Sequence, residues 1–271
     1  MRVRYMIAGL AVLAAWAVLV AGAAPGGPGS GPLQQRWANV IAQGPPSGGV
    51  GDDGSHDDES DDDESEPFKQ ARIYIEFNST DNDLGFHVFL DAEDWQDLRI
   101  EKPDGTTLFQ VTGESGFGEL GMTELFFEGA EPSLDEFPLD ELLALFPEGD
   151  YRFTATTVDG GELESTWTFT HLYPDAPVIN TPGEDEIVNP SNLVVDWDPV
   201  TSPSGIEILE YEVIIGALDP VMKSSLRVPA SSTSLTIPTE MLLPGTEYEL
   251  EVIAVEVNRS QTIATSTFST P

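Results

Sequence analysis

The chain has 271 residues, with 48 acidic and 11 basic side chains and a formal net charge of −37. A chain this acidic repels phosphate backbones and anionic membranes, so we expect no nucleic-acid partner. Cysteine is absent, which excludes disulfides, thiolate metal sites and a cysteine nucleophile. Such a surface attracts cations or basic partners, or keeps the protein soluble in a saline medium.

The first segment, residues 1–23, has the composition of a secretory signal peptide. Arg2 and Arg4 precede an apolar run at residues 6–20, and Ala21-Gly22-Ala23 supplies a small-x-small cleavage pattern. We expect a mature protein that begins at Ala24, is secreted to the extracellular or periplasmic space, and has no membrane span. The alternative is a retained anchor, because the segment nears the ~20 residues that cross a bilayer.

Residues 24–67 have the composition of a flexible linker. Glycine, proline and serine are frequent in residues 25–50, and residues 51–66 hold ten acidic side chains and no lysine or arginine. Like charges in such a run repel one another, and the run has little apolar surface to bury. We therefore expect a disordered acidic linker ahead of the folded part.

Residues 68–173 predict a first β-sandwich domain. Ile73, Ile75 and Phe77 alternate with polar residues, which is the period of a half-buried strand. Further strand patterns follow, separated by turns, as in all-β sandwiches; they lie at residues 86–90, 98–100, 109–111, 151–155 and 163–169.

The stretch at residues 139–146 fits either a short helix or a loop with a helical turn. If it is a helix, Ser133 or Asp135 is the candidate N-terminal cap.

Residues 174–271 predict a second all-β domain with seven strands. Leu193, Val195 and Trp197 share one face of a strand. Near the end, Tyr248, Leu250 and Val252 alternate with glutamates and follow the turn Pro244-Gly245. One face of this strand is therefore expected to be buried and the other charged.

Several of these residues together resemble a fibronectin type III domain. They are Pro177, Trp197, Tyr211 and the corner Leu242-x-Pro-Gly-Thr-x-Tyr248. The resemblance implies a sandwich with the tryptophan in its core and the tyrosine hydroxyl bonded to backbone near the preceding turn. The Arg-Gly-Asp triplet through which some members bind integrins is absent, so that activity is not expected.

The stretch Leu145-Phe146-Pro147-Glu148-Gly149-Asp150-Tyr151 is similar to that corner and suggests a second immunoglobulin-like sandwich. The predicted fold class is thus all-β, with two immunoglobulin-like β-sandwich domains in tandem after the acidic linker.

The most specific ligand hypothesis is a calcium site. Asp81, Asp83 and Asn78 lie in a polar turn between two predicted strands, and hard oxygen ligands at alternating positions suit Ca²⁺. The alternative is an ordinary turn in which Asn and Asp tolerate special backbone angles. No other cofactor is expected.

The sequence supports no catalytic constellation. It contains no Gly-x-Ser-x-Gly and no His-Glu-x-x-His, and its histidines, His56, His87 and His171, are scattered. Zinc needs three or four converging ligands, so a zinc site made of the histidines is disfavoured. We expect a protein that is not an enzyme.

The predicted function is a secreted or cell-surface, non-catalytic protein that acts as a binding, adhesion or spacer module. Its expected partner is an unidentified extracellular protein or polysaccharide. The alternative is an accessory or catalytic domain at residues 68–173 that acts on extracellular polysaccharide, with the second domain as spacer.

Overall fold

The computed structural model describes residues 65–271. The predicted signal segment, and all but the last three residues of the predicted linker, lie outside the described residues. The described residues belong to one compact unit. Within them, no helix is both long and apolar enough to cross a membrane.

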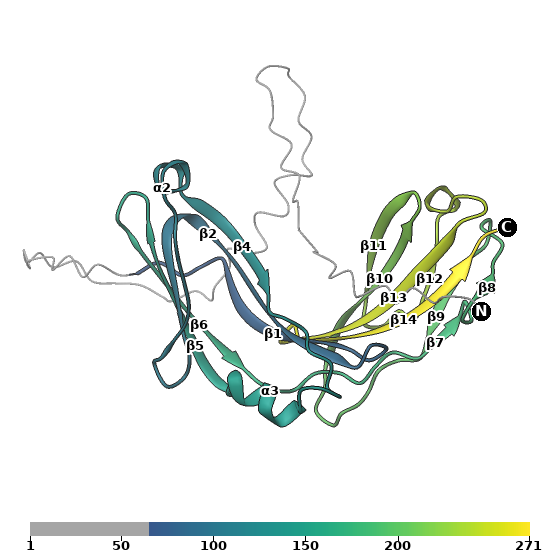
Figure 1. Ribbon diagram of the computed structural model, residues 1–271, viewed down its shortest axis with the longest axis horizontal. Coiled ribbons are helices and arrows are strands. Elements are labelled where there is room, and N and C mark those ends of the chain that lie inside the picture. The colour runs from purple at the N-terminus through teal and green to yellow at the C-terminus, as the bar shows by residue number, and fades with distance from the viewer. Residues whose placement is uncertain (1–64) are drawn as a thin grey trace, which may run out of the picture. The chain divides into compact units, whose positions relative to one another are not determined.

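The region up to residue 173 is built from strands with two short helices (Figure 1). Its elements are β1 (Gln70–Asn78), β2 (Asp83–Glu101), β3 (Thr107–Thr112), α2 (Gly116–Leu120), β4 (Met122–Glu128), α3 (Leu139–Leu145), β5 (Gly149–Thr157) and β6 (Glu162–Phe169).

The long strand β2 organises this region because it belongs to two groups of strands. Its first half pairs antiparallel with β1 and β4, and its second half pairs antiparallel with β3 and β5. Ladder irregularities between Asp91 and Trp95 mark the change of partners. Buried residues from both groups form one core cluster, in which Trp95 is completely buried. The result is a sandwich whose two layers share one bent strand.

Three local features of this region differ from expectation. The predicted stretch is helical over Leu139–Leu145, but Pro138 is the N-terminal cap residue and no side chain caps the helix, so neither Ser133 nor Asp135 is the cap. Strand β4 and helix α2 were not predicted. Glu66, expected within the linker, forms a parallel bridge with Leu163, so the ordered fold begins before Phe68.

The second region is a two-layer sandwich. Its elements are β7 (Ile179–Thr181), β8 (Glu186–Ile187), β9 (Val194–Trp197), β10 (Ile208–Leu218), β11 (Val221–Pro229), β12 (Ser234–Thr236), η1 (Thr239–Met241), β13 (Glu247–Glu256) and β14 (Gln261–Ser269). One layer has the order β12-β9-β7, and the other contains β11-β10-β13-β14. Strand β11 was not predicted.

Two tyrosines tie corners of the chain to its backbone. The Leu243 N–H donates to the Tyr248 hydroxyl oxygen at 2.6 Å, as the resemblance implied. In the first region, the Tyr151 hydroxyl donates to the Pro147 carbonyl at 3.0 Å. Trp197 is buried beside Tyr211, with their ring centroids 5.4 Å apart. The predicted corners and the predicted core tryptophan are therefore present.

The two regions are joined through their sheets. Strand β14 pairs in parallel with β1, with Gln261 opposite Glu76. The Ser79 N–H donates to the Ile263 carbonyl at 3.0 Å, and the Thr265 N–H donates to the Thr80 hydroxyl at 2.9 Å. Through these bonds, the strands of the first region and the larger layer of the second region form a single eleven-stranded sheet.

Candidate functional site: a buried histidine among glutamates

The strand register brings a histidine and several glutamates to one face of β1, β2 and β4. His87 on β2 is opposite Tyr74 on β1 and opposite Glu128 on β4. Glu76 lies two residues after Tyr74 and therefore shares its face. Glu131, in the loop that follows β4, completes the group, which we call the His87 cluster: Glu76, His87, Glu128 and Glu131.

The histidine lies close to three carboxylates without a hydrogen bond to any of them. The Nε2 atom of His87 is 3.8 Å from Glu76, 3.9 Å from Glu128 and 3.8 Å from Glu131. Hydrogen bonds between nitrogen and oxygen are shorter, at about 2.7–3.2 Å. Nε2 is buried and has no hydrogen-bond partner, and the whole side chain is 5% exposed. The imidazole and the three carboxylates therefore face one another without direct hydrogen bonds, and they attract one another only when the imidazole is protonated.

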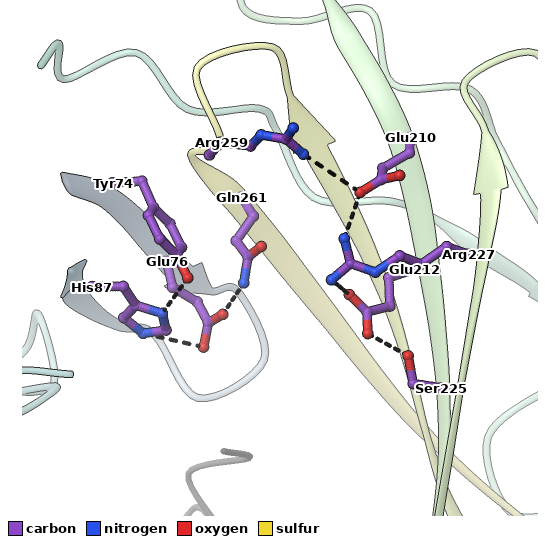
Figure 2. Close-up of polar contacts among 9 residues, drawn as sticks. All are labelled: Tyr74, Glu76, His87, Glu210, Glu212, Ser225, Arg227, Arg259 and Gln261. Atoms are coloured by element: carbon purple, nitrogen blue, oxygen red, sulfur yellow. Dashed lines mark hydrogen bonds and ion pairs between the residues drawn. The ribbon is translucent and has the colours of Figure 1, made fainter. Parts of the chain in front are cut away.

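Aromatic rings fix the orientation of the imidazole. Tyr74 and Phe126 contact it edge-on, with centroid distances of 5.1 and 5.5 Å. The Tyr74 hydroxyl also lies 3.4 Å from Nδ1. With Nδ1 turned toward Tyr74, Nε2 is directed at the carboxylates (Figure 2 shows Tyr74, His87 and Glu76).

A glycine makes room for one of the glutamates. Gly85 is opposite Glu76 in the β1–β2 ladder. A Cβ atom added to Gly85 would lie 2.6 Å from Cγ and 2.8 Å from Oε1 of Glu131, which is closer than such atoms approach in proteins. The missing side chain is thus what allows Glu131 to reach His87.

The pKa values of the cluster are shifted because its carboxylates are crowded and poorly solvated. The pKa of Glu128 is raised to about 7, mainly by burial; His87 opposes the shift, and Glu131 and Glu76 add to it. Burial also raises the pKa of Glu76. Burial lowers the pKa of His87, but the three glutamates outweigh it and leave that pKa above its ordinary value. Burial thus disfavours the charged forms of Glu76 and Glu128, and the neighbouring glutamates favour the charged form of His87.

The cluster reaches the junction between the two regions through Glu76. The side-chain amide of Gln261, on β14, donates to Glu76 Oε2. The other oxygen of Glu76, Oε1, is the one nearest His87. Figure 2 shows Glu76 between these two residues.

A second group of glutamates lies on β10, and it is neutralised differently (Figure 2). The Arg227 guanidinium is 2.5 Å from Glu210 and 2.6 Å from Glu212. The Ser225 hydroxyl donates to Glu212, and Arg259 lies 3.8 Å from Glu210. We call these residues the Arg227 cluster.

Two of the predicted calcium residues, Asn78 and Asp81, are hydrogen-bonded to each other within the turn. The Asn78 amide donates to Asp81 at 2.9 Å, and the Asn78 side-chain oxygen accepts from the backbone N–H groups of Thr80 and Asp81. Such bonds are those of an ordinary Asx turn. Burial raises the pKa of Asp83 to about 6, with Glu131, Asp81 and Glu76 adding to the shift. Calcium binding at Asp81, Asp83 and Asn78 stays a prediction.

The His87 cluster was missed in the sequence, where only convergence among histidines was considered. The described histidines lie in different surroundings, since His171 bonds the Phe146 carbonyl at 2.7 Å. Among the residues from 65 onward, Glu76, His87 and Glu131 have side-chain atoms close enough to share a metal ion. A signal was present: His87 interrupts the apolar run of residues 86–90. The unpredicted strand β4 and the loop after it supply the partners.

Comparisons with known proteins support the assignment of the second region. Residues 184–267 match the family model of the fibronectin type III domain, so the chain contains such a domain. A search of curated proteins gave no match.

Three solved structures are similar to this chain. A segment of two fibronectin type III domains from chicken tenascin is 13% identical, with 74% of this chain and 98% of that chain covered and a TM-score of 0.29. The fn3 domain of human collagen alpha-1(XX) is 23% identical, with 36% and 85% covered and a TM-score of 0.26. The FN1–FN3 domains of chicken CNTN1 are 12% identical, with 76% and 65% covered and a TM-score of 0.29.

Proposed function

We propose that this chain is a secreted or cell-surface, non-catalytic protein whose two β-sandwich domains, residues 68–173 and 174–271, act as a binding, adhesion or spacer module. The observation that carries the proposal is the fibronectin type III domain at residues 184–267. Domains of this sandwich type present loops at their ends for recognition and keep a closed core between them.

The joined sheets support a spacer or adhesion role. Strands β14 and β1 pair in parallel, and further bonds connect the turn after β1 to β14. A backbone ladder between two domains resists bending better than a flexible linker does. A protein built in this way holds its binding surfaces at a fixed separation.

The charge supports a basic or cationic partner. With a net charge of −37, the protein attracts partners that carry lysine or arginine, and the attraction weakens as salt increases. The expected partner is an extracellular protein or polysaccharide.

One observation favours a second candidate, a domain that acts on extracellular polysaccharide. The pKa of Glu128 is about 7, and a carboxyl group with such a pKa suits a general acid. Glycoside hydrolysis pairs such an acid with a second carboxylate. Glu131, close to the same histidine, would be that second group.

An assay of polysaccharide cleavage separates the two candidates. The purified full chain is incubated with a panel of extracellular polysaccharides, and released reducing ends are measured beside co-sedimentation with each polymer. The proposal predicts no release above buffer for any polymer. Release that disappears in the Glu128→Gln variant would establish the second candidate instead.

Secretion is tested separately. Mass spectrometry of the protein recovered from the medium or periplasm should find Ala24 as its first residue. A cell-bound protein that retains residues 1–23 would contradict secretion and would favour the anchored, cell-surface form.

A further inference from the structure

The His87 cluster places three glutamates around a single imidazole. The side chains of these glutamates are 14–23% exposed. Within residues 65–271, the ion pairs that these glutamates form are all with His87. Bringing several carboxylates together away from water is costly unless a cation compensates them.

The spacing fits a small metal ion. Tetrahedral metal sites with bonds of about 2.0–2.2 Å hold their ligand atoms about 3.4 Å apart. The imidazole nitrogen of His87 and the carboxylate oxygens are 3.8–3.9 Å apart, so small side-chain rotations bring them within reach of one ion. The facing atoms of Glu76, His87 and Glu131 all lie within 4.8 Å of one another.

The histidine is prepared for this role independently of the carboxylates. Its Nε2 is buried and has no hydrogen-bond partner. The rings of Tyr74 and Phe126 orient it, and the Tyr74 hydroxyl lies where it can accept a hydrogen bond from Nδ1–H. Metal-binding histidines commonly donate their second N–H in this way, which fixes the tautomer with a free Nε2.

We propose that Glu76, His87 and Glu131 bind a divalent transition-metal ion of the zinc type, with Glu128 as a neighbouring carboxylate. One imidazole nitrogen with carboxylate oxygens suits zinc better than calcium or magnesium, which prefer oxygen ligands alone. The site uses none of the residues of the predicted calcium turn.

Two further residues position the ligands. Gly85 leaves the space that Glu131 occupies. Gln261 binds the outer oxygen of Glu76 from β14, so it orients a ligand across the junction of the two regions. Bound metal should therefore stabilise the β1–β14 pairing as well as the first region.

Binding is tested by titrating zinc sulfate into the chelator-treated full chain at pH 7.5, with isothermal titration calorimetry. We expect saturable binding of one zinc ion per chain. Gln261→Leu removes a residue that orients a ligand and should weaken zinc binding about tenfold. Glu131→Gln removes a ligand itself and should weaken zinc binding by more than about tenfold. Gly85→Ala should also weaken it, although it removes no ligand. Circular dichroism checks that each variant is folded.

The acidic run at residues 51–66 supplies the control. It contains His56 and ten acidic residues and could gather zinc diffusely. His56→Ala should leave the one-site titration unchanged. A proton–nitrogen NMR spectrum of the histidine rings should show zinc shifting the Nε2 of His87.

The proposal is overturned if the natural chain shows no saturable zinc binding. It is also overturned if Glu131→Gln and Gly85→Ala bind with unchanged affinity while His56→Ala loses binding. Calcium chloride, titrated in the same way, should bind this site at least tenfold more weakly than zinc. Equal or tighter calcium binding that Glu131→Gln abolishes would refute the transition-metal assignment.

Discussion

The two glutamate clusters of this protein show two ways of placing carboxylates in a partly buried sheet. In the Arg227 cluster, a guanidinium contacts Glu210 and Glu212 at 2.5 and 2.6 Å. In the His87 cluster, the distances from Nε2 to the three carboxylates are 3.8–3.9 Å. Arginine is always charged and can contact two carboxylates at once, whereas histidine is charged only when its imidazole is protonated. Glu210 and Glu212 thus contact a permanently charged partner, whereas the glutamates of the His87 cluster face an imidazole.

This difference gives the clusters opposite responses to the loss of charge. Neutralising a carboxylate of the Arg227 cluster removes a partner from a satisfied arginine, which costs stability. Neutralising a carboxylate of the His87 cluster relieves repulsion between like charges as long as no metal is bound.

The largest effect is expected for Arg227→Met. The change leaves Glu210 and Glu212 without their closest cation, and the Glu212 side chain is 6% exposed. Losing one partner of a buried pair costs several kcal/mol, and because Arg227 is itself partly exposed we expect a loss of about 3 kcal/mol in the free energy of unfolding, measured with urea. The matched control is Arg99→Met, because Arg99 is 48% exposed and lies 2.8 Å from its partner Glu101. The account of the Arg227 cluster fails if the two variants lose equal stability.

A smaller effect with a defined pH range is expected for Glu251→Gln on β13. Burial raises the pKa of Glu251 to about 7; Lys223 opposes the shift, while Glu249, Glu76 and Glu212 reinforce it. A raised pKa contributes stability that is complete below about pH 4.5 and is lost as the pH rises through about 7. At pH 8 the charged carboxylate therefore costs the natural protein stability, on the order of 2 kcal/mol.

Urea unfolding across the pH range checks this effect. Glu251→Gln should be more stable than the natural chain at pH 8 and equal to it at pH 4.5. A difference that is the same at both pH values would show that the titration of Glu251 is not its cause.

The smallest effects come from one conservative change made in each cluster. Without metal at pH 8, Glu212→Gln should lose about 1 kcal/mol, because it weakens the contact with Arg227 and the hydrogen bond from Ser225. Glu131→Gln should gain about 1 kcal/mol, because it removes one of several neighbouring negative charges. Thermal unfolding in the presence of chelator measures both, and changes of the same sign would remove the distinction between the clusters.

The sequence predicts the frame of this protein better than its site. Trp197, Tyr248 and Tyr151 were placed correctly, since alternation and turn residues act over a few neighbouring positions. Strand β4 was missed because its residues are only partly buried and show weak alternation. The continuous course of β2 was missed as well, since its bend depends on which strands lie beside it.

The His87 cluster depends on contacts that sequence periodicity does not encode. Its members come from β1, β2, β4 and the following loop, and the pairing of these strands decides which side chains meet. The shared sheet of β1 and β14 is likewise a pairing across the predicted boundary between the domains. His87 could have been noted as a polar residue within an apolar run, but its partners required the register.

The zinc dependence of thermal unfolding in Glu131→Gln and Glu212→Gln shows whether the His87 cluster binds a metal ion. Both variants lose one carboxylate charge, but only Glu131 belongs to the proposed metal site. We predict that zinc raises the unfolding temperature of the natural chain and of Glu212→Gln by similar amounts and leaves that of Glu131→Gln nearly unchanged. If zinc raised the unfolding temperature of both variants equally, zinc would bind elsewhere, and the proposed metal site in the His87 cluster would be contradicted.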